Sequence, residues 1–349
     1  MFNIIKHIVF KTICLIKVHE LFRFLNRQKV VIILYHGVVE KKLNPFSWTQ
    51  MPLQKFERQI EYISKKYNVL PLITLIEKLI NNEELPNYSL AITFDDGLKN
   101  NYLTAFPVLK RFNLPATIFL TTCNIGSNGL LWFDRLYLAV KETKKTGVDL
   151  SEEGLGFFSI LTPDKKNQTL SALLSYMKRL QKNEKDLLLN KVLNKLDVDS
   201  MEAQDSNPFK SLDWDDIVSM HQSNLISFGA HTETHNIMTR ITREEVLQEI
   251  EISKKKIEEK LGNKCLLFAF PNGQKDDFNN EIKDAVKNRG FLCTFTTIGK
   301  FNEYGTDQYE LGRFPIGSDV DEQYFKLLIS GAIGFLSKIQ SALGGLKSK

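Results

Sequence analysis

The stretch Leu90–Gly97, Leu-Ala-Ile-Thr-Phe-Asp-Asp-Gly, places two adjacent carboxylates directly after a run of apolar and β-branched residues. This run has the length and composition of a buried strand, and Gly97 allows the chain to turn sharply after it. A buried carboxylate needs a cation, a hydrogen-bond donor or a metal ion beside it. Taken alone, an Asp-Asp-Gly segment is typical of a polar turn that closes a strand. Its meaning therefore depends on residues elsewhere in the chain.

The composition is that of a globular protein: 349 residues, of which 43% are hydrophobic and 25% charged. The formal net charge is only +5 and the lysines are scattered among glutamates, so we expect no nucleic-acid partner. Four cysteines, Cys14, Cys123, Cys265 and Cys293, are widely spaced and form no Cys-x-x-Cys pair. This pattern argues against a disulfide framework and a thiolate zinc site, and predicts buried, reduced thiols.

Residues 1–29 are predicted to form an N-terminal amphipathic helix, with Ile4, Ile8 and Leu15 near one face. Charged residues interrupt the apolar run too often for a membrane span, and no small-residue cleavage site follows. Two interpretations remain open: a helix docked on the domain, or a basic helix on a membrane surface. In both cases we expect a cytoplasmic protein, and in the second it lies peripherally at the inner face of the membrane.

From residue 30 the sequence alternates strand-like and helical segments, which predicts an α/β protein. The expected strands are residues 30–35, 90–94, 116–121, 225–230, 265–270 and 291–297.

About a hundred residues separate the strands at 116–121 and 225–230, although a β-α-β unit needs only about thirty. We therefore predict a helical insertion at about residues 130–210, with no strand in it. Trp132 lies in an aromatic part of this insertion, and it either anchors the core of the insertion or offers a stacking platform for a sugar. Residues 321–349 are predicted to form a C-terminal helix and tail.

The segment His231–His235, His-Thr-Glu-Thr-His, directly follows a predicted strand. Two histidines four residues apart direct their rings to one point if the backbone turns helically after the strand. Strand ends in a β/α array are where such folds collect their active sites. Two imidazoles and one carboxylate, with a position left for water, are typical of a catalytic zinc-type site. One of Asp95 and Asp96 then binds the metal while its neighbour handles protons, and the expected chemistry is hydrolysis of an acyl bond.

The two motifs resemble those of the polysaccharide deacetylases with a NodB-homology domain, also called carbohydrate esterase family four. The family's Thr-Phe-Asp-Asp-Gly motif matches residues 93–97, its His-Ser/Thr-x-x-His motif matches residues 231–235, and the resemblance covers residues 30–320. It implies a distorted (β/α) barrel of about seven strands that carries the helical insertion. It also implies that Asp95 is the general base. The implied ligands of a divalent metal, with zinc the expected ion, are Asp96, His231 and His235.

Residues 268–273, Phe-Ala-Phe-Pro-Asn-Gly, resemble the family's third motif, an Arg-x-Pro-aromatic-Gly wall of the substrate groove. Here Ala269 stands in place of the arginine and Asn272 in place of the aromatic residue. The resemblance implies that Pro271, Asn272 and Gly273 bind substrate.

The family's last motif, Leu-x-His, supplies the histidine usually assigned as general acid, but this chain has no histidine after His235. Arg313 occupies the corresponding place, and an arginine cannot shuttle protons at neutral pH, although it can stabilise an oxyanion or bind a phosphate. We expect Asp95 to return its proton to the leaving amine. His36, next to Gly37 at the end of the strand at 30–35, is the alternative acid; it is equally explained as a strand end satisfied by local hydrogen bonds.

These observations predict a metal-dependent amidohydrolase that removes an N-acetyl group from an amino sugar of a cell-surface glycan or its precursor. The expected partner is an N-acetylated sugar or polysaccharide, with a lipid-linked sugar as one form. The alternatives are a deformylase or an O-acetyl esterase that acts on a lipid-linked sugar, and a catalytically weak glycan-binding protein with the same fold.

Overall fold

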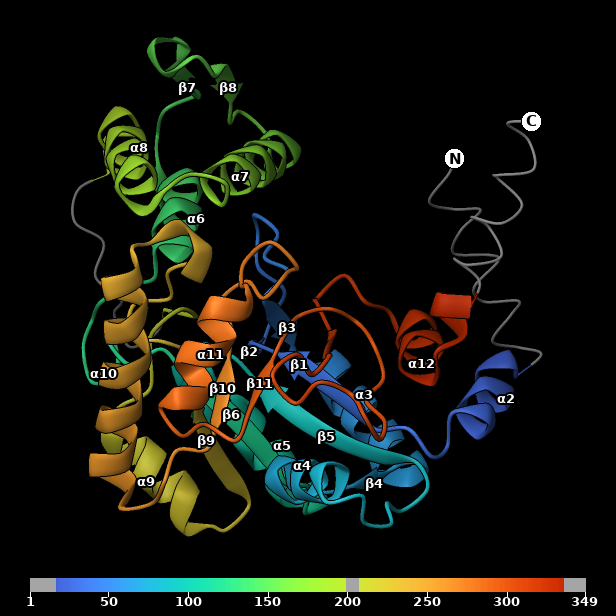
Figure 1. Ribbon diagram of the computed structural model, residues 1–349. Helices are drawn as coiled ribbons and strands as arrows, with labels where there is room; N and C mark the ends of the chain where they lie inside the picture. The colour runs from blue at the N-terminus through green and yellow to red at the C-terminus, as the bar shows by residue number, and fades with distance from the viewer. Residues whose placement is uncertain (1–16, 199–206, 336–349) are drawn as a thin grey trace, which may run out of the picture.

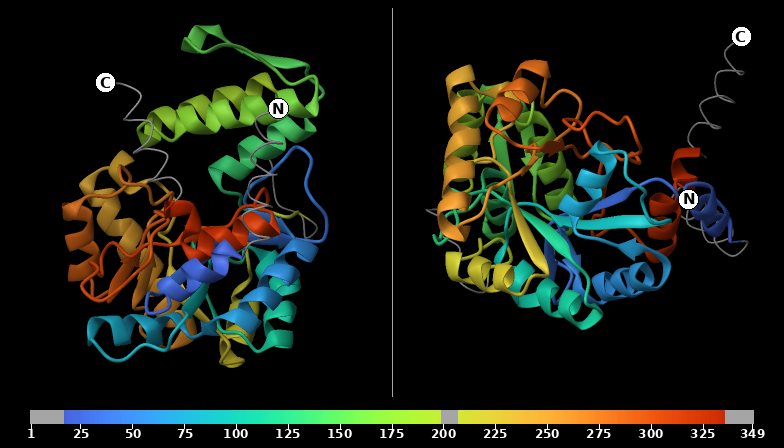
Figure 2. Two further views of the ribbon diagram at one scale, coloured as in Figure 1. Left: turned by 90° about the vertical axis from the view of Figure 1, so that its right-hand side faces the viewer. Right: turned by 60° about the horizontal axis from the view of Figure 1, so that its bottom comes forward.

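The computed structural model describes residues 17–198 and 207–335. Its central feature is an eight-stranded parallel sheet that curls into a distorted barrel (Figures 1 and 2). The α/β class and the distorted barrel of about seven strands with a helical insertion are thereby confirmed. Seven strands pair in the order β11 (Cys293–Phe295), β10 (Leu267–Ala269), β9 (Ile226–Ala230), β6 (Ala116–Leu120), β5 (Ser89–Phe94), β1 (Val31–Tyr35) and β12 (Phe314–Pro315), and β4 (Asn68–Val69) pairs with the start of β5.

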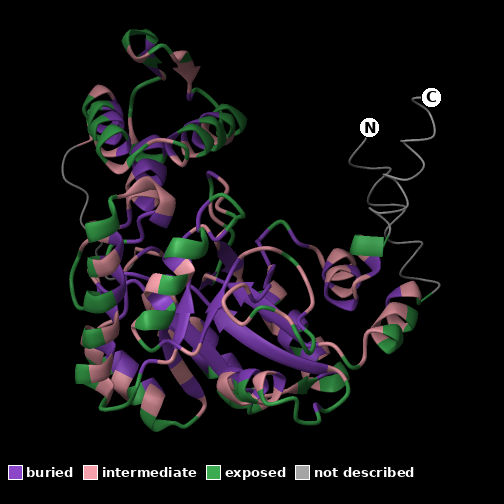
Figure 3. Cartoon of the chain, viewed as in Figure 1, coloured by how far each residue is buried: buried purple, intermediate pink, exposed green. Residues whose placement is uncertain are grey.

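The strands read as unbroken apolar runs because the sheet is covered on both faces. Every residue of β1 and of β5 is buried, and Figure 3 shows the strands as the buried centre of the molecule. The helices of the outer layer and the ends are α2 (Val18–Leu25), α3 (Leu53–Lys66), α4 (Leu72–Ile80), α5 (Phe106–Phe112), α9 (Trp214–Gln222), α10 (Arg243–Leu261), α11 (Asn280–Asn288) and α12 (Glu322–Ser330).

The barrel closes weakly between β11 and β12. Phe295 forms an isolated parallel bridge with Leu311, and the Thr296 amide donates to the Leu311 carbonyl at 2.8 Å. This closure brings the start of β12 against the end of β11. Arg313, which immediately precedes β12, therefore faces the carboxyl ends of the neighbouring strands.

The insertion contains α6 (Trp132–Glu142), β7 (Gly147–Leu150), β8 (Gly156–Ser159), α7 (Pro163–Met177) and α8 (Lys182–Lys195), which share a hydrophobic cluster of their own. The expectation of no strand in it is wrong, because β7 and β8 pair as an antiparallel hairpin. The hairpin is short, and only one side of it is covered: Val148 is buried, whereas Phe157 is 66% exposed. So small a buried face leaves little apolar periodicity in the sequence.

The two ends of the described chain lie together, with α12 packed against α2 and α3. The Asn26 side chain donates to the Ser330 carbonyl at 3.0 Å. Most of the predicted N-terminal helix lies outside the described residues, as does the tail after Phe335. No helix in the described ranges combines the length and the apolarity needed to cross a bilayer.

Three cysteines carry free thiols, and Cys14 lies outside the described residues. Cys265 and Cys293 are buried as expected, but Cys123 is only half-buried. A disulfide framework plays no part among these three residues.

Two short strands, β2 (Gly37–Val39) and β3 (Gln50–Pro52), form a separate parallel pair beside the barrel. A wide π-helical turn at 101–105 leads into α5, where a single helix with a break near Pro107 is predicted from the sequence. In this turn the Asn101 side chain donates to the His36 carbonyl at 2.6 Å. The turn therefore fixes the backbone of a candidate site residue.

Candidate active site

Asp95 and Asp96 lie at the carboxyl end of β5, and both are buried. The Asp95 amide donates to the Tyr35 carbonyl at 3.0 Å, which extends the pairing of β5 with β1 by one step. The backbone then turns through two left-handed residues, Asp96 with φ 74° and Gly97 with φ 71°. A Cβ at Gly97 would meet Leu120 at 2.7 Å, so both the turn and the close packing require glycine there.

The histidine motif follows β9, but the expected helical turn is wrong. Thr232 and His235 have φ values of 66° and 58°, so the segment folds as an irregular loop with two left-handed residues. The Thr232 hydroxyl accepts the His235 amide at 3.0 Å inside this loop. From α10, Glu249 accepts the Thr234 amide at 2.7 Å and also bonds its hydroxyl. These polar contacts, rather than helical periodicity, bring the two rings together.

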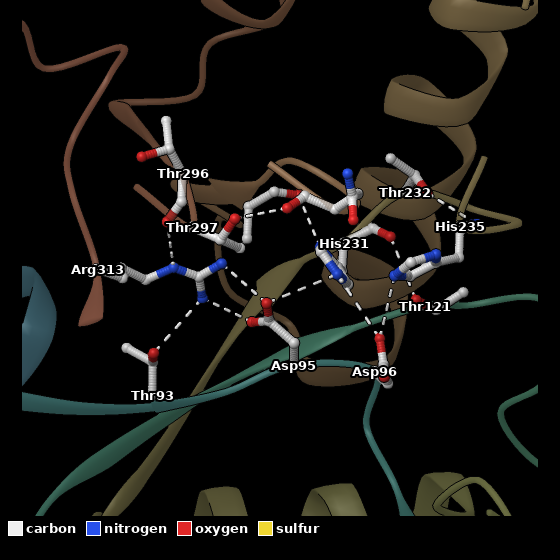
Figure 4. Close-up of polar contacts among 12 residues, drawn as sticks. Thr93, Asp95, Asp96, Thr121, His231, Thr232, His235, Thr296, Thr297 and Arg313 are labelled. Atoms are coloured by element: carbon white, nitrogen blue, oxygen red, sulfur yellow. Dashed lines mark hydrogen bonds and ion pairs between the residues drawn. The ribbon is translucent and has the colours of Figure 1, made fainter. Parts of the chain in front are cut away.

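The rings of His231 and His235 converge on Asp96 (Figure 4). Asp96 Oδ1 lies 3.6 Å from His231 Nε2 and 3.3 Å from His235 Nε2, and one ligand atom from each residue lies within 4.8 Å of the others. Ligand atoms about 2.1 Å from a tetrahedral ion are about 3.4 Å apart, so this spacing fits a metal. The Asp96 Oδ1 atom is buried and receives no hydrogen bond from the protein. A divalent cation would satisfy it.

His231 has the tautomer and charge that a metal ligand needs. Its Nδ1 lies 2.8 Å from the carbonyl of Ala269 in β10. A carbonyl only accepts, so Nδ1 carries the proton and Nε2 directs a lone pair toward Asp96. Burial lowers the pKa of His231 to about 4, which keeps the ring neutral at physiological pH. Burial alone would raise the pKa of Asp96, but the imidazoles around it hold that pKa below its usual value.

Asp95 is held by Arg313, the residue predicted to stand where the family has a histidine. The guanidinium has no exposed surface, and its two Nη atoms donate to the two Asp95 oxygens at 2.6 and 2.8 Å. Arg313 Nε also donates to the Thr296 carbonyl at 3.0 Å. Burial would raise the pKa of Asp95, but Arg313 together with the nearby His231 and His36 lowers it below its usual value. Asp95 is thus ionised and fixed in orientation.

The predicted site residues divide into those that face one cavity and those that do not. A cavity of about 340 Å³ opens above the carboxylates and histidines. Arg313, which by its chemistry could stabilise an oxyanion or bind a phosphate, does not line the cavity, because its guanidinium is turned inward to Asp95. Pro271 and Gly273 do not line it either. The predicted residues that do line it are His36, Asp95, Asp96, Trp132, His231, His235 and Asn272.

His36 lines the cavity near Asp95 and Asp96, and the contacts of its ring leave one nitrogen unsatisfied. Its ring meets the Trp48 ring edge-on at 4.9 Å between centroids. Its Nδ1 is buried and has no hydrogen-bond partner in the protein. Burial lowers the pKa of His36 below its usual value. A local hydrogen bond of the ring nitrogen therefore does not explain this histidine.

Apart from Trp132, sequence reasoning missed the residues that the insertion and the loop before β3 contribute to this cavity. Trp48, Phe133, Leu174 and Lys178 all line it. These residues lie far from the motifs along the chain, so the sequence did not indicate that they belong to the site. Only the packing of the insertion against the barrel brings them to the cavity.

The fold and the site together define a class: a parallel (β/α) barrel with an Asp-His-His candidate metal centre at the carboxyl ends of its strands. Residues 82–293 match the family model of polysaccharide deacetylase. The chain belongs to the polysaccharide deacetylase family, and the resemblance seen in its motifs is confirmed. The family consists of hydrolases of carbon–nitrogen bonds other than peptide bonds, in agreement with the predicted enzyme class.

The relatives include the poly-β-1,6-N-acetyl-D-glucosamine N-deacetylase of Staphylococcus aureus, which is 29% identical over 161 residues, 45% of this chain and 54% of that protein. The chain spans about half the length of the curated relatives it matches. Among solved structures, the Streptococcus pyogenes deacetylase PplD in complex with acetate has a TM-score of 0.56 at 16% identity and covers 86% of this chain and 98% of its own. IcaB from Ammonifex degensii has a TM-score of 0.56 at 18% identity and covers 87% and 96%. These structures share the fold.

Arg313→Met should strongly destabilise the protein, because it leaves the Asp95 charge buried without its partner. We expect the free energy of unfolding, measured in urea, to fall by about 3–5 kcal/mol. Arg289→Met is the control, since Arg289 pairs with the exposed Glu251 at 3.7 Å and should cost less than about 1 kcal/mol. When the double variant Asp95→Asn/Arg313→Met is compared with the two single variants, the coupling energy between the two residues should be at least about 1 kcal/mol. Equal losses for Arg313→Met and Arg289→Met would contradict the assignment.

Proposed function

We propose that this protein is a metal-dependent hydrolase that removes the N-acetyl group from an amino sugar of a cell-surface glycan or its precursor. The observation that carries the proposal is the meeting of Asp96, His231 and His235 at the base of a cavity, with the ionised Asp95 beside them. An Asp-His-His set that is open on one side has the donors of a catalytic divalent site, and zinc suits two imidazoles and one carboxylate.

Asp95 is the proposed general base. Its Oδ2 lies 3.7 Å from His231 Nε2, so the carboxylate borders the position that the three ligands surround. Arg313 uses one lone pair on each oxygen, and the remaining lone pairs can accept a proton from an attacking water. When bound, the metal supplies a Lewis acid that polarises the acyl carbonyl and makes water more acidic. Arg313 acts through Asp95 and is a positioning residue.

The proton for the leaving amine has two candidate sources. Asp95 can return the proton that it took from water, as the sequence suggests. His36 gains support as the second source, because it lines the same cavity and its Nδ1 lacks a partner.

The proposed substrate is an N-acetylated glucosamine unit. The Staphylococcus aureus relative named above is an N-deacetylase of poly-β-1,6-N-acetyl-D-glucosamine, and its matching segment is 29% identical to this chain. Removal of a formyl group or an O-acetyl ester uses the same attack on a carbonyl. These two reactions are therefore outcomes of the assay below, as is binding without turnover.

We further propose that the protein works in the cytoplasm and touches the inner face of the membrane through α2. Three side chains on this helix are exposed although they are large and apolar: Leu21 (57%), Phe24 (52%) and Leu25 (60%). Lys17 precedes them and Arg27 follows them. Apolar side chains flanked by cations on a surface helix are the pattern of a helix that lies on an anionic bilayer.

Asp95→Asn should abolish hydrolysis while leaving the metal bound, whereas Asp96→Asn should lose both. The metal content per chain is measured by mass spectrometry. The release of acetate and formate and the hydrolysis of esters are measured on N-acetylglucosamine oligomers and on acylated lipid-linked sugars, with and without chelator. We expect Asp95→Asn to lower acetate release by about 10²–10⁴-fold, and the exposed Asp215→Asn to have no effect. An active Asp95→Asn enzyme, or acetate release that persists in chelator, would overturn the mechanism. Metal content without turnover of any acylated sugar would instead identify a glycan-binding protein.

His36→Gln separates the two sources of the amine proton. If His36 is the acid, turnover should fall by about 10²-fold or more with metal content unchanged. His221→Gln is the control, because this histidine lies on α9 and bonds Asn263 at 2.9 Å, away from the cavity. Undiminished turnover in His36→Gln removes His36 from the reaction and leaves both proton transfers to Asp95.

The membrane proposal predicts that changing Leu21, Phe24 and Leu25 together to Gln weakens binding to phosphatidylglycerol vesicles. A buried apolar side chain contributes about 1.5–3 kcal/mol, so the partition coefficient should fall at least about 100-fold even with partial insertion. The control changes three exposed apolar residues of the insertion: Phe157, Leu161 and Leu187. Equal cosedimentation of both triple variants would contradict the role of α2.

A further inference from the structure

Lys178 brings a cation from the insertion to the edge of the candidate active site. It ends α7, and its Nζ donates to the Asn272 side-chain oxygen at 2.8 Å. Asn272 follows β10 with φ 59°, and its side-chain nitrogen donates to Asp277 at 2.5 Å. The ammonium therefore spans from the insertion to the barrel, and it lines the cavity that holds Asp95 and Asp96.

No carboxylate is in direct contact with this ammonium. In the part of the chain that the structure describes, no Asp or Glu oxygen lies within 4 Å of Lys178 Nζ, and Lys178 is the one lysine or arginine lining the cavity. The two cavity carboxylates are engaged elsewhere, Asp95 by Arg313 and Asp96 by the histidines. Burial lowers the pKa of Lys178, and Asp277, which Asn272 separates from the ammonium, offsets this only in part.

Lys178 also lines a second cavity, of about 440 Å³, that adjoins the first. Trp48, Phe133 and Leu174 line both cavities. Among the residues unique to the second, Phe46, Tyr137, Leu170 and Phe209 offer apolar surface, and the others are Ser47, Asp134, Asn167, Ser171 and Ser175. It also contains Asp134, whose pKa burial raises well above its usual value, and no ion pair joins it to Lys178. Lys178 thus stands between the cavity that holds the reacting groups and a second cavity partly lined by the apolar side chains of Phe46, Leu170 and Phe209.

We infer that Lys178 binds an anionic group of the substrate, and that the second cavity beyond it receives the group attached to that anion. This inference rests on the proposed function, because it takes the acyl group to lie at Asp95 and Asp96. The substrate class is an N-acylated amino sugar joined through a phosphate to an apolar aglycone.

The reacting groups, Lys178 and the second cavity follow one another in that order, and this order favours a phosphodiester over a carboxylate on the sugar chain. A phosphate has oxygens for the Lys178 ammonium and also continues into a second substituent, which the second cavity can cover. A sugar carboxylate would end at Lys178 and leave Phe46, Tyr137 and Leu170 facing water. A hydroxyl could accept the same hydrogen bond from Lys178, but it would not neutralise the charge.

Binding measurements on the full chain test the inference separately from turnover. The probes are N-acetylglucosamine 1-(octyl phosphate), the neutral octyl N-acetylglucosaminide, and a disaccharide of N-acetylglucosamine and glucuronate. By calorimetry, the wild type should bind the octyl phosphate probe about 10- to 100-fold more tightly than the neutral octyl glycoside. Lys178→Met should lose this preference and bind the neutral glycoside within about twofold of the wild type. Lys178→Arg should retain most of the preference, because it keeps the charge.

Lys165→Met is the matched control, since Lys165 lies on the same helix and its Nζ bonds only Gln168, at 3.3 Å. A phosphate preference that survives Lys178→Met, or a wild type that binds the two octyl probes equally, would overturn the inference. A Lys178-dependent preference confined to the glucuronate disaccharide would support the anion contact and place the anion on the sugar chain. If no probe releases acetate in the wild type, the proposed function fails, whereas the binding preference still decides the role of Lys178.

Discussion

The buried ion pair between Arg313 and Asp95 is the interaction on which the carboxyl end of the barrel depends. Either charge alone would be very costly in this interior, and the two together are held by donor distances of 2.6 and 2.8 Å. The third contact of the guanidinium, at 3.0 Å to the Thr296 carbonyl, joins the ends of β5, β11 and β12. This is where the sheet closes through the single bridge at Phe295. One side chain therefore neutralises a carboxylate, fixes its orientation and strengthens the weakest part of the barrel.

The same pair explains how two adjacent carboxylates come to differ. In an extended strand, neighbouring side chains point to opposite faces, but the left-handed backbone at Asp96 turns the second carboxylate to the same end of the barrel as the first. Arg313 neutralises the charge of Asp95, whereas Asp96 Oδ1 has imidazole nitrogens beside it and no hydrogen-bond donor. A cation is thus needed at Asp96 and already supplied at Asp95. The division into a metal ligand and a base follows from this difference in partners, independently of the motif that first suggested it.

The fold was largely predictable from the sequence because buried parallel strands are unbroken apolar runs, and both site motifs directly follow such runs. The loop around Thr232 was not predictable in the same way, since its shape comes from a hydrogen bond to Glu249 on another element rather than from local periodicity. Arg313 could be aligned with a family position, but its partner could not, because bidentate pairing with Asp95 exists only once the barrel closes. The β7–β8 hairpin was missed because it buries too little surface to leave a pattern.

The insertion shows most clearly that the candidate site includes residues outside the sequence motifs. Two cations lie at the candidate site, Arg313 in the barrel and Lys178 at the edge of the insertion, and their surroundings differ. Arg313 lies inside the barrel, where its charge is already paired with Asp95, so its guanidinium is not available to bind a ligand. Lys178 arrives on a helix of the insertion, contacts only a neutral amide in the barrel and lies open to two cavities. A charge that no carboxylate contacts directly can be stabilised further by an anion that binds there. Under the proposed function, the barrel supplies the reacting groups and the insertion contributes to the choice of substrate.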